Sequence, residues 1–101
     1  MAQHNKLGKD GELIAFMFLQ REGFKILATN FSWQKAEVDI IAKDGEFLVF
    51  TEVKTRGSEK FGPPEQAITP KKESLYKEAA EAYLAQHPSD LEIRFDVISI
   101  I

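Results

Sequence analysis

Two acidic residues and one lysine near the middle of the sequence have the types and spacing of a metal-dependent hydrolytic site. Asp39 lies on one apolar run, and Glu52 and Lys54 lie two positions apart on the next. Carboxylate oxygens are the ligands that hard ions such as Mg²⁺ or Mn²⁺ prefer. An ammonium group beside them can stabilise a phosphate oxygen that gains charge in a transition state. Since the chain has no cysteine, disulfides, thiolate zinc sites and a cysteine nucleophile are excluded.

A β-hairpin should bring these residues together. Two runs rich in β-forming residues, 37–43 and 46–55, are joined by Asp44-Gly45, which is a strong signal for a tight turn. With these two residues as the turn, Glu37 faces Glu52 across the hairpin. Side chains alternate along a strand, so four polar side chains then project from one face, namely Glu37, Asp39, Glu52 and Lys54.

The predicted arrangement crowds like charges, which is unfavourable unless a cation joins them. Glu37 opposite Glu52 should destabilise the sheet, and Asp39 lies diagonal to Glu52 at about 7–8 Å. Two side chains and a divalent ion can bridge that gap, so the predicted metal ligands here are Asp39, Glu52 and Glu37. The alternative is a solvated hairpin face with ordinary surface charges, but Leu48 and Phe50 on the same face argue against it.

Glu12 is a further candidate, from an expected helix over about residues 5–22. Asn5 is its expected N-cap and Gly23 its expected stop. The helix is predicted by apolar residues at helical spacing, which are Leu7, Ile14, Met17 and Phe18. Glu12 shares another stripe with Gly8, Ala15 and Leu19, in which the small residues beside Glu12 permit close approach of a second backbone. Glu12 is either a further metal ligand or a glutamate favoured by the helix dipole.

A locally basic stretch over residues 54–72 is the predicted nucleic-acid-binding region. Only Glu59 and Glu65 oppose its positive charges. The candidate contacts to a phosphate backbone are Arg56, Lys60, Lys71 and Lys72. Gln66 is either a group that orients a phosphate or water, or a surface residue. The alternative for the whole stretch is a solvated loop and helix start, and the net charge of -3 argues against indiscriminate binding of nucleic acid.

Two other residues carry weaker signals. Trp33 is either a base-stacking residue or ordinary packing between strands. Asp96 is expected to have a structural role, paired with Arg94 or with a helix end. His4 and His87 lie at element ends without a partner at ligand spacing, so we assign them no role.

The remaining segments complete an α/β fold in the order αβββαβ. Residues 24–31 alternate as a strand does, and residues 56–64 should form a loop. A second helix should begin with Thr69 as N-cap and Pro70 as first residue, and end before Pro88. Residues 91–101 form the last expected strand. Because it follows a crossover helix, that strand should lie parallel to a neighbour in a mixed β-sheet flanked by helices.

Length and composition limit the number of domains and the class of protein. The chain has 101 residues, which is enough for a single domain over residues 1–101 and no separate catalytic module. Hydrophobic residues make up 44% and charged residues 29% of the sequence, which is typical of a globular protein. No segment approaches the ~18 apolar residues of a membrane span. We therefore expect a cytoplasmic protein without a membrane partner.

Asp39 followed by Glu52-Val53-Lys54, within this order of elements, resembles the PD-(D/E)xK superfamily of restriction-endonuclease-like nucleases. More narrowly, the sequence is similar to the YraN-like family of bacterial proteins, kin to archaeal Holliday-junction resolvases. The segments that carry this likeness are Asn5-Lys6, Gly8, Gly11-Glu12, Gly23, Asn30 and residues 37–42, 49–56 and 94–98. Val38 stands where the superfamily has proline, and family members are expected to continue a little beyond Ile101.

The resemblance implies Asp39 and Glu52 as metal ligands, Lys54 as the catalytic lysine and Glu12 as the first-helix carboxylate of the resolvase-like branch. It implies a restriction-endonuclease-like fold, Mg²⁺ or Mn²⁺ as cofactor and DNA as partner. The predicted function is metal-dependent, endonuclease-like cleavage of nucleic acid, with branched DNA among the candidate substrates. The alternative is a nucleic-acid-binding module of the same fold without turnover. Junction cleavage on two symmetric strands would suit a twofold homodimer.

Overall fold

A computed structural model describes the backbone of residues 2–55 and 69–100 and the side chains of residues 10–55 and 69–100. The expected loop over 56–64 and the candidates Arg56, Lys60 and Gln66 lie outside the described residues. The elements in chain order are α1 (Ala2–Arg21), β1 (Lys25–Trp33), β2 (Ala36–Asp44), β3 (Phe47–Thr55), α2 (Pro70–Gln86) and β4 (Glu92–Ile100). The predicted order αβββαβ is confirmed.

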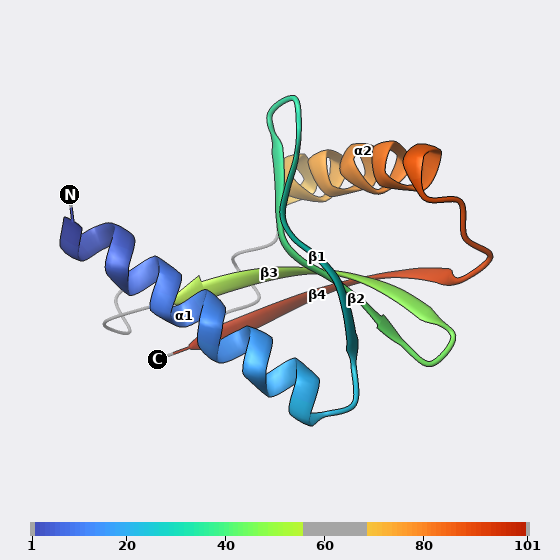
Figure 1. Cartoon of the computed structure of the whole chain (residues 1–101). Helices are drawn as coiled ribbons and strands as arrows, with labels where there is room; N and C mark the ends of the chain where they lie inside the picture. Colours follow the sequence, from blue (N-terminus) through green and yellow to red (C-terminus); the bar gives the residue numbers. More distant parts are fainter. Residues whose placement is uncertain (1, 56–68, 101) are drawn as a thin grey trace.

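The four strands form one mixed sheet in the order β1-β2-β3-β4. The β1–β2 and β2–β3 pairs are antiparallel, and β3 and β4 are parallel. Helix α2 connects β3 to β4, so the expected parallel crossover is confirmed. Helices α1 and α2 lie on opposite sides of the sheet (Figure 1), which makes a layered α/β structure. Among the described residues, no helix is long and apolar enough to cross a membrane.

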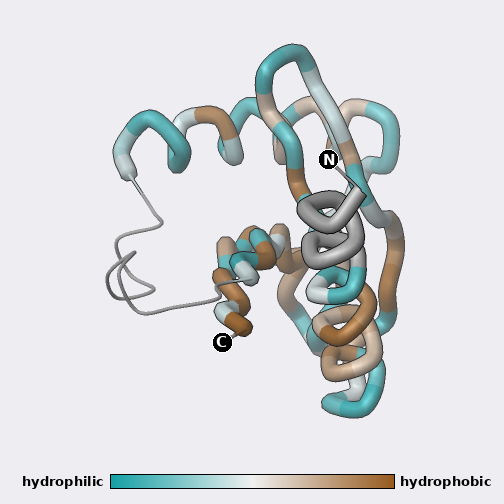
Figure 2. Tube along the Cα trace, turned by 90° about the vertical axis from the view of Figure 1, so that its left-hand side faces the viewer, coloured by the Kyte–Doolittle hydropathy of each residue, from teal (hydrophilic) through white to brown (hydrophobic). Residues whose placement is uncertain are grey.

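Each helix packs its own core against the sheet. On the α2 side, Tyr83 stands edge-on to Phe50 with ring centroids 6.0 Å apart, and Ile41 and Leu48 fill the same cluster. The α1 side has a smaller cluster of buried residues, namely Ala15, Leu19, Ile40 and Ala42. The trace is hydrophilic at the tip of the β1–β2 hairpin (Figure 2), away from both clusters. Strands β2 and β3 therefore carry core residues on both of their faces.

Helix α1 forms as predicted, but its boundaries and its buried face differ from the expectation. It begins at Ala2, so Asn5 lies within the helix rather than at its N-cap. The apolar stripe that predicted the helix faces outward, with Met17 59% and Phe18 50% exposed, whereas Ala15 and Leu19 are buried. The stripe of Ala15 and Leu19, rather than that of Met17 and Phe18, therefore faces the sheet.

Gly11 explains why the small residues of α1 face inward. A Cβ atom at this position would lie 1.9 Å from Oγ1 of Thr55, at the end of β3. Such a separation is far below van der Waals contact, so only glycine permits this approach of helix to strand. The sequence placed a close approach at the stripe of Gly8, Glu12 and Ala15, and the structure has one at the neighbouring residue Gly11. It holds α1, including Glu12, next to the end of the strand that carries Glu52 and Lys54.

The β2–β3 hairpin turns one residue later than predicted. Asp44 pairs with Phe47, so Gly45 and Glu46 are the two turn residues and Ile41 faces Phe50. Gly45 has a φ of 59°, and it is the only turn residue of the two with positive φ. Glycine at the first central position is typical of a type II′ turn, whereas a turn centred on Asp44-Gly45 would require positive φ at both residues. The predicted pairing of Glu37 with Glu52 is therefore wrong.

Strand β2 bends at Asp39. Val38 packs in the α2-side core, whereas Ile40, two residues later, packs in the α1-side core. A regular strand would place both on the same face. The ladder between β2 and β3 extends only as far as the pair Ile40 and Thr51. The bend therefore opens a gap between the two strands, and Asp39 lies at its edge.

Candidate active site

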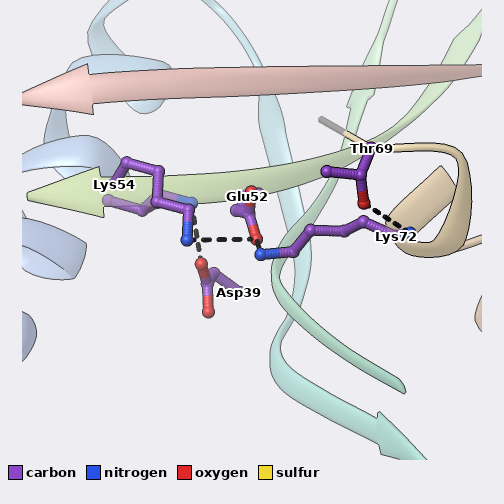
Figure 3. Close-up of polar contacts among 6 residues, drawn as sticks. Asp39, Glu52, Lys54, Thr69 and Lys72 are labelled. Carbon is purple, nitrogen blue, oxygen red and sulfur yellow. Dashed lines mark hydrogen bonds and ion pairs between the residues drawn. The ribbon is translucent and has the colours of Figure 1, made fainter. Parts of the chain in front are cut away.

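The side chains predicted to act together meet at this gap. Asp39, Glu52 and Lys54 point toward one another, and Lys72 reaches them from the first turn of α2 (Figure 3). These residues line a cavity of about 380 Å³, together with Glu37 of β2 and Tyr76 of α2. All four polar residues that the sequence placed on one face of the hairpin line this cavity. Their ladder positions differ from those predicted.

Asp39 fills the gap between β2 and β3. Its Oδ2 atom accepts a hydrogen bond of 2.7 Å from the backbone N–H of Val53, so the carboxylate replaces a missing ladder contact. Burial raises the pKa of Asp39, and the neighbouring carboxylates of Glu52 and Glu37 add to this, against the opposing effects of the Val53 hydrogen bond and the Lys72 charge. The electrostatic surroundings of Asp39 therefore favour the arrival of a cation.

Glu52 is a buried carboxylate with two lysine partners. Only 8% of its side chain is exposed. Its Oε1 atom lies 3.9 Å from Nζ of Lys54 and forms a closer ion pair with Nζ of Lys72. A buried charge is costly unless it is paired, so the fold keeps Glu52 in place by surrounding one carboxylate oxygen with positive charge.

Lys72 owes its position to the start of α2. Thr69 is the N-cap, and its Oγ1 accepts a hydrogen bond of 3.1 Å from the backbone N–H of Lys72, as the sequence predicted for this cap. Partial burial is the largest single effect and lowers the pKa of Lys72, but hydrogen bonding to Glu52 and Lys54 and the charges of Glu52 and Asp39 together outweigh it, so the pKa is raised. Lys72 is therefore charged at neutral pH and lies within the carboxylate cluster.

Tyr76 is a member of the site that the sequence reasoning missed. It lies one helical turn after Lys72, is only 6% exposed, and lines the same cavity as Glu52. Burial raises its pKa, as do the charges of Glu52 and Asp39. Among the described residues, its hydroxyl has no hydrogen-bond partner. Lys72 and Tyr76 stand four positions apart, and this i, i+4 spacing on a helix is the signal that could have identified the pair.

The oxygen atoms at the gap suit a hard divalent cation. Within residues 10–55 and 69–100, no three carboxylate or imidazole groups lie close enough together to hold a metal ion. Asp39 and Glu52 are therefore a two-carboxylate set, and Mg²⁺ is commonly held by one or two carboxylates together with water and substrate oxygens. The N–H and C=O of one strand residue point to the same side, so the Val53 carbonyl should supply a further oxygen beside Asp39.

The other predicted acidic ligands lie around this pair. Glu37 is exposed and lines the same cavity, next to Lys35 in the β1–β2 turn, a lysine that the sequence reasoning also missed. Glu12 lines a second cavity of about 470 Å³ that opens between α1 and β1. Asp39 borders both cavities. Glu12 therefore lies on one side of Asp39, and Lys72 lies on the other.

The remaining candidates lie elsewhere. Lys71 is exposed and does not border the site cavity. Trp33 is 41% exposed and borders a hollow against the C-terminal half of α2, away from Asp39. Asp96 accepts two hydrogen bonds from Arg94, of 3.1 and 3.0 Å, and Arg94 also pairs with Asp44. The structural role expected for Asp96 is confirmed, because the Arg94 guanidinium ties β4 to the end of β2.

The fold and site together define a class of protein. It is a mixed α/β protein with two carboxylates and two lysines gathered where the central strands separate. The chain belongs to the family described as Uncharacterised protein family UPF0102, whose model matches residues 11–100. The resemblance to YraN-like proteins found in the sequence is thereby confirmed.

Relatives extend this match over nearly the whole chain. A UPF0102 protein of Flavobacterium psychrophilum is 49% identical over 100 residues, which cover 99% of this chain and 84% of the relative. Another, of Geobacter metallireducens, is 48% identical over 102 residues, with 99% and 84% covered. A third, of Thermodesulfovibrio yellowstonii, is 45% identical over 95 residues, with 94% and 85% covered. The names of these relatives state a family and no activity, so function has to be argued from the site.

Proposed function

We propose that this protein is a metal-dependent phosphodiesterase that cleaves nucleic acid, with DNA as its substrate. The observation that carries the proposal is the meeting of Asp39, Glu52 and Lys54 at the opening between β2 and β3. The carboxylates offer oxygen ligands and the lysine offers a charge for a phosphate. These are the components that hydrolysis of a phosphodiester requires.

Each residue has a distinct task in this proposal. Asp39 and Glu52 would hold a Mg²⁺ or Mn²⁺ ion. When bound, such an ion supplies charge neutralisation and activation of the attacking water. The Lys54 ammonium stabilises the charge that develops on the phosphate oxygens as the water oxygen bonds to phosphorus and the bond to the leaving oxygen breaks. The attacking water releases a proton to solvent, and the leaving oxygen takes one up from solvent.

The distribution of charge supports a phosphate substrate despite the acidic net charge of -3. Lys35, Lys54 and Lys72 converge on one cavity from three different elements. Local potential, rather than net charge, determines where an anion binds. The same cavity also holds Glu37, Asp39 and Glu52, so its formal charge is balanced, and a divalent ion bound to the carboxylates would make it positive toward a phosphate.

A cleavage assay tests the proposal. Wild-type protein is incubated with fluorescent four-way junctions, flaps, linear duplexes and single strands, in the presence of Mg²⁺, Mn²⁺ or EDTA. We expect metal-dependent cleavage of at least one substrate, abolished by EDTA. The variant Lys54→Met should reduce the rate by roughly 100-fold or more. Lys77→Met is the matched control, because Lys77 is exposed and pairs only with Glu73 on the same helix among its described contacts.

Two outcomes would count against the enzyme. If no substrate is cut but one is retarded in a gel, the protein is a nucleic-acid-binding module of this fold without turnover. If cleavage persists at the wild-type rate in Lys54→Met, the activity arises elsewhere or from a contaminating nuclease. Equal loss in Lys54→Met and Lys77→Met would indicate a general effect of removing a positive charge.

A further inference from the structure

We propose that Lys72 is a built-in counter-cation, which holds the Glu52 carboxylate in the metal-free protein and must leave it when a divalent ion binds. This inference rests on the proposed function, since it concerns the same metal site. It assigns Lys72 two successive partners: the carboxylate before metal binding, and the phosphate of the substrate afterwards.

The burial of Glu52 is the first argument. Its side chain is 8% exposed, so an unpaired carboxylate there would be costly. Of the two lysines on Oε1, Lys72 makes the closer contact, and Lys54 lies at 3.9 Å. The Lys72 charge also favours the ionised form of the Asp39 carboxyl group. The Lys72 ammonium therefore supplies positive charge where both predicted metal ligands need it.

The second argument is competition for one carboxylate. The Lys72 ammonium contacts Oε1 of Glu52, which is one of the two carboxylates that the proposed function assigns to the metal ion. Two positive groups on the same carboxylate repel each other strongly in a partly buried site. Lys72 can yield because its side chain is 34% exposed and because its flexible stem comes from α2 rather than from the hairpin.

The third argument is an available acceptor beside Lys72. The Tyr76 hydroxyl is buried and has no hydrogen-bond partner among the described residues. It lies one turn further along α2, on the side that lines the site cavity. An unpaired buried hydroxyl is unfavourable. In the metal-free protein the Tyr76 oxygen can therefore still gain a hydrogen bond. The displaced ammonium can donate to this oxygen while it remains in the cavity.

Thermodynamic linkage then defines what Lys72 does. If the metal displaces the ammonium, the free energy of the Lys72–Glu52 ion pair is lost on metal binding. The ion pair therefore weakens metal binding by that free energy. The same ammonium, once displaced, adds a positive charge to the cavity and strengthens phosphate binding. Loss of the charge should therefore have opposite effects on the two ligands, whereas a merely structural role would impair both.

Calorimetric titration with Mn²⁺ tests the first effect, without any substrate. Lys72→Met keeps the length of the side chain and removes its charge, and should bind Mn²⁺ roughly tenfold more tightly than wild type. Lys72→Arg retains a cation and should bind close to wild type. Lys71→Met is the matched control, because Lys71 is the exposed neighbour outside the cavity, and it should leave Mn²⁺ affinity unchanged.

Retardation of DNA in a gel, with Ca²⁺ in place of Mn²⁺ to prevent cleavage, tests the second effect. Lys72→Met should bind DNA several-fold more weakly than both Lys72→Arg and the exposed-lysine control Lys77→Met. Unchanged or weaker Mn²⁺ binding by a folded Lys72→Met protein would overturn the inference and leave the proposed function intact. Absence of Mn²⁺ binding by wild type would instead overturn the proposed function itself, so the two failures are distinguishable.

Discussion

Substitution of Gly11 by alanine should destabilise the protein, although alanine is the better helix former. An added Cβ would lie 1.9 Å from Oγ1 and 3.1 Å from Cβ of Thr55. Intrinsic helix propensity favours alanine over glycine by about 1 kcal/mol. Overpacking of a tight contact typically costs about 1–3 kcal/mol, and this contact is at the severe end. The expected net loss is therefore about 1–2 kcal/mol.

Urea denaturation followed by circular dichroism measures this loss. A loss of 1–2 kcal/mol in a chain of this length should lower Tm by roughly 5–10 °C. Thr55→Ala removes the clashing Oγ1 atom and should restore much of the stability in the double variant. The double-mutant cycle should therefore show a coupling free energy of about 1 kcal/mol or more.

The reasoning fails if Gly11→Ala is at least as stable as wild type, because helix propensity would then outweigh the contact. It also fails if the single and double variants show no coupling, because the clash with Thr55 would not be the cause of the loss. Either result would mean that α1 does not approach β3 as closely as the structure has it.

Two further substitutions separate stability from function at the site. Burial raises the pKa of Asp39, so the contribution of this carboxyl group to stability is lost as the pH rises through the raised pKa. Asp39→Asn should therefore stabilise the metal-free protein at pH 7 while removing Mn²⁺ binding. Lower stability in EDTA would contradict this. Tyr76→Phe removes a buried hydroxyl without a described partner and should raise the free energy of unfolding by about 1 kcal/mol. A decrease of similar size in the free energy of unfolding would show that the hydroxyl has a hydrogen-bond partner.

The order of elements could be predicted from the sequence because local signals agreed with one another. Thr69 followed by Pro70 marked the start of α2, and the structure confirms Thr69 as the N-cap, which accepts a hydrogen bond from the backbone N–H of Lys72. The crossover helix required a parallel last strand, and β4 is parallel to β3. These features depend on neighbouring residues, so a single sequence is sufficient to find them.

The register of the β2–β3 hairpin could not be predicted in the same way. Asp44-Gly45 and Gly45-Glu46 are both acceptable turn pairs, since one suits a type I′ turn and the other a type II′ turn. The structure selects the second, and Asp44 becomes a strand residue paired with Arg94 of β4. A tertiary contact between distant strands thus accompanies this choice of register.

The buried face of α1 was misread for a related reason. Hydrophobic periodicity favours a stripe that includes Met17 and Phe18, yet both residues are half-exposed. The sheet instead receives Gly11 and Ala15, since close approach of the backbones requires small residues. The pairing of Lys72 with Glu52 was likewise hidden, because it joins two elements that are separated by the residues between β3 and α2.

The bend at Asp39 links the architecture of the sheet to the chemistry proposed for it. In a continuous β2–β3 ladder, the facing backbone N–H and C=O groups of both strands would be hydrogen-bonded to each other, and no opening would remain for a substrate. Here the ladder stops after Ile40 and Thr51, and the Asp39 carboxylate takes the N–H of Val53 in place of a backbone carbonyl. One carboxylate oxygen therefore secures the strand gap while the other remains available as a ligand. This dual use explains why an amide at position 39, which can still accept the hydrogen bond, should preserve the fold while removing the metal site.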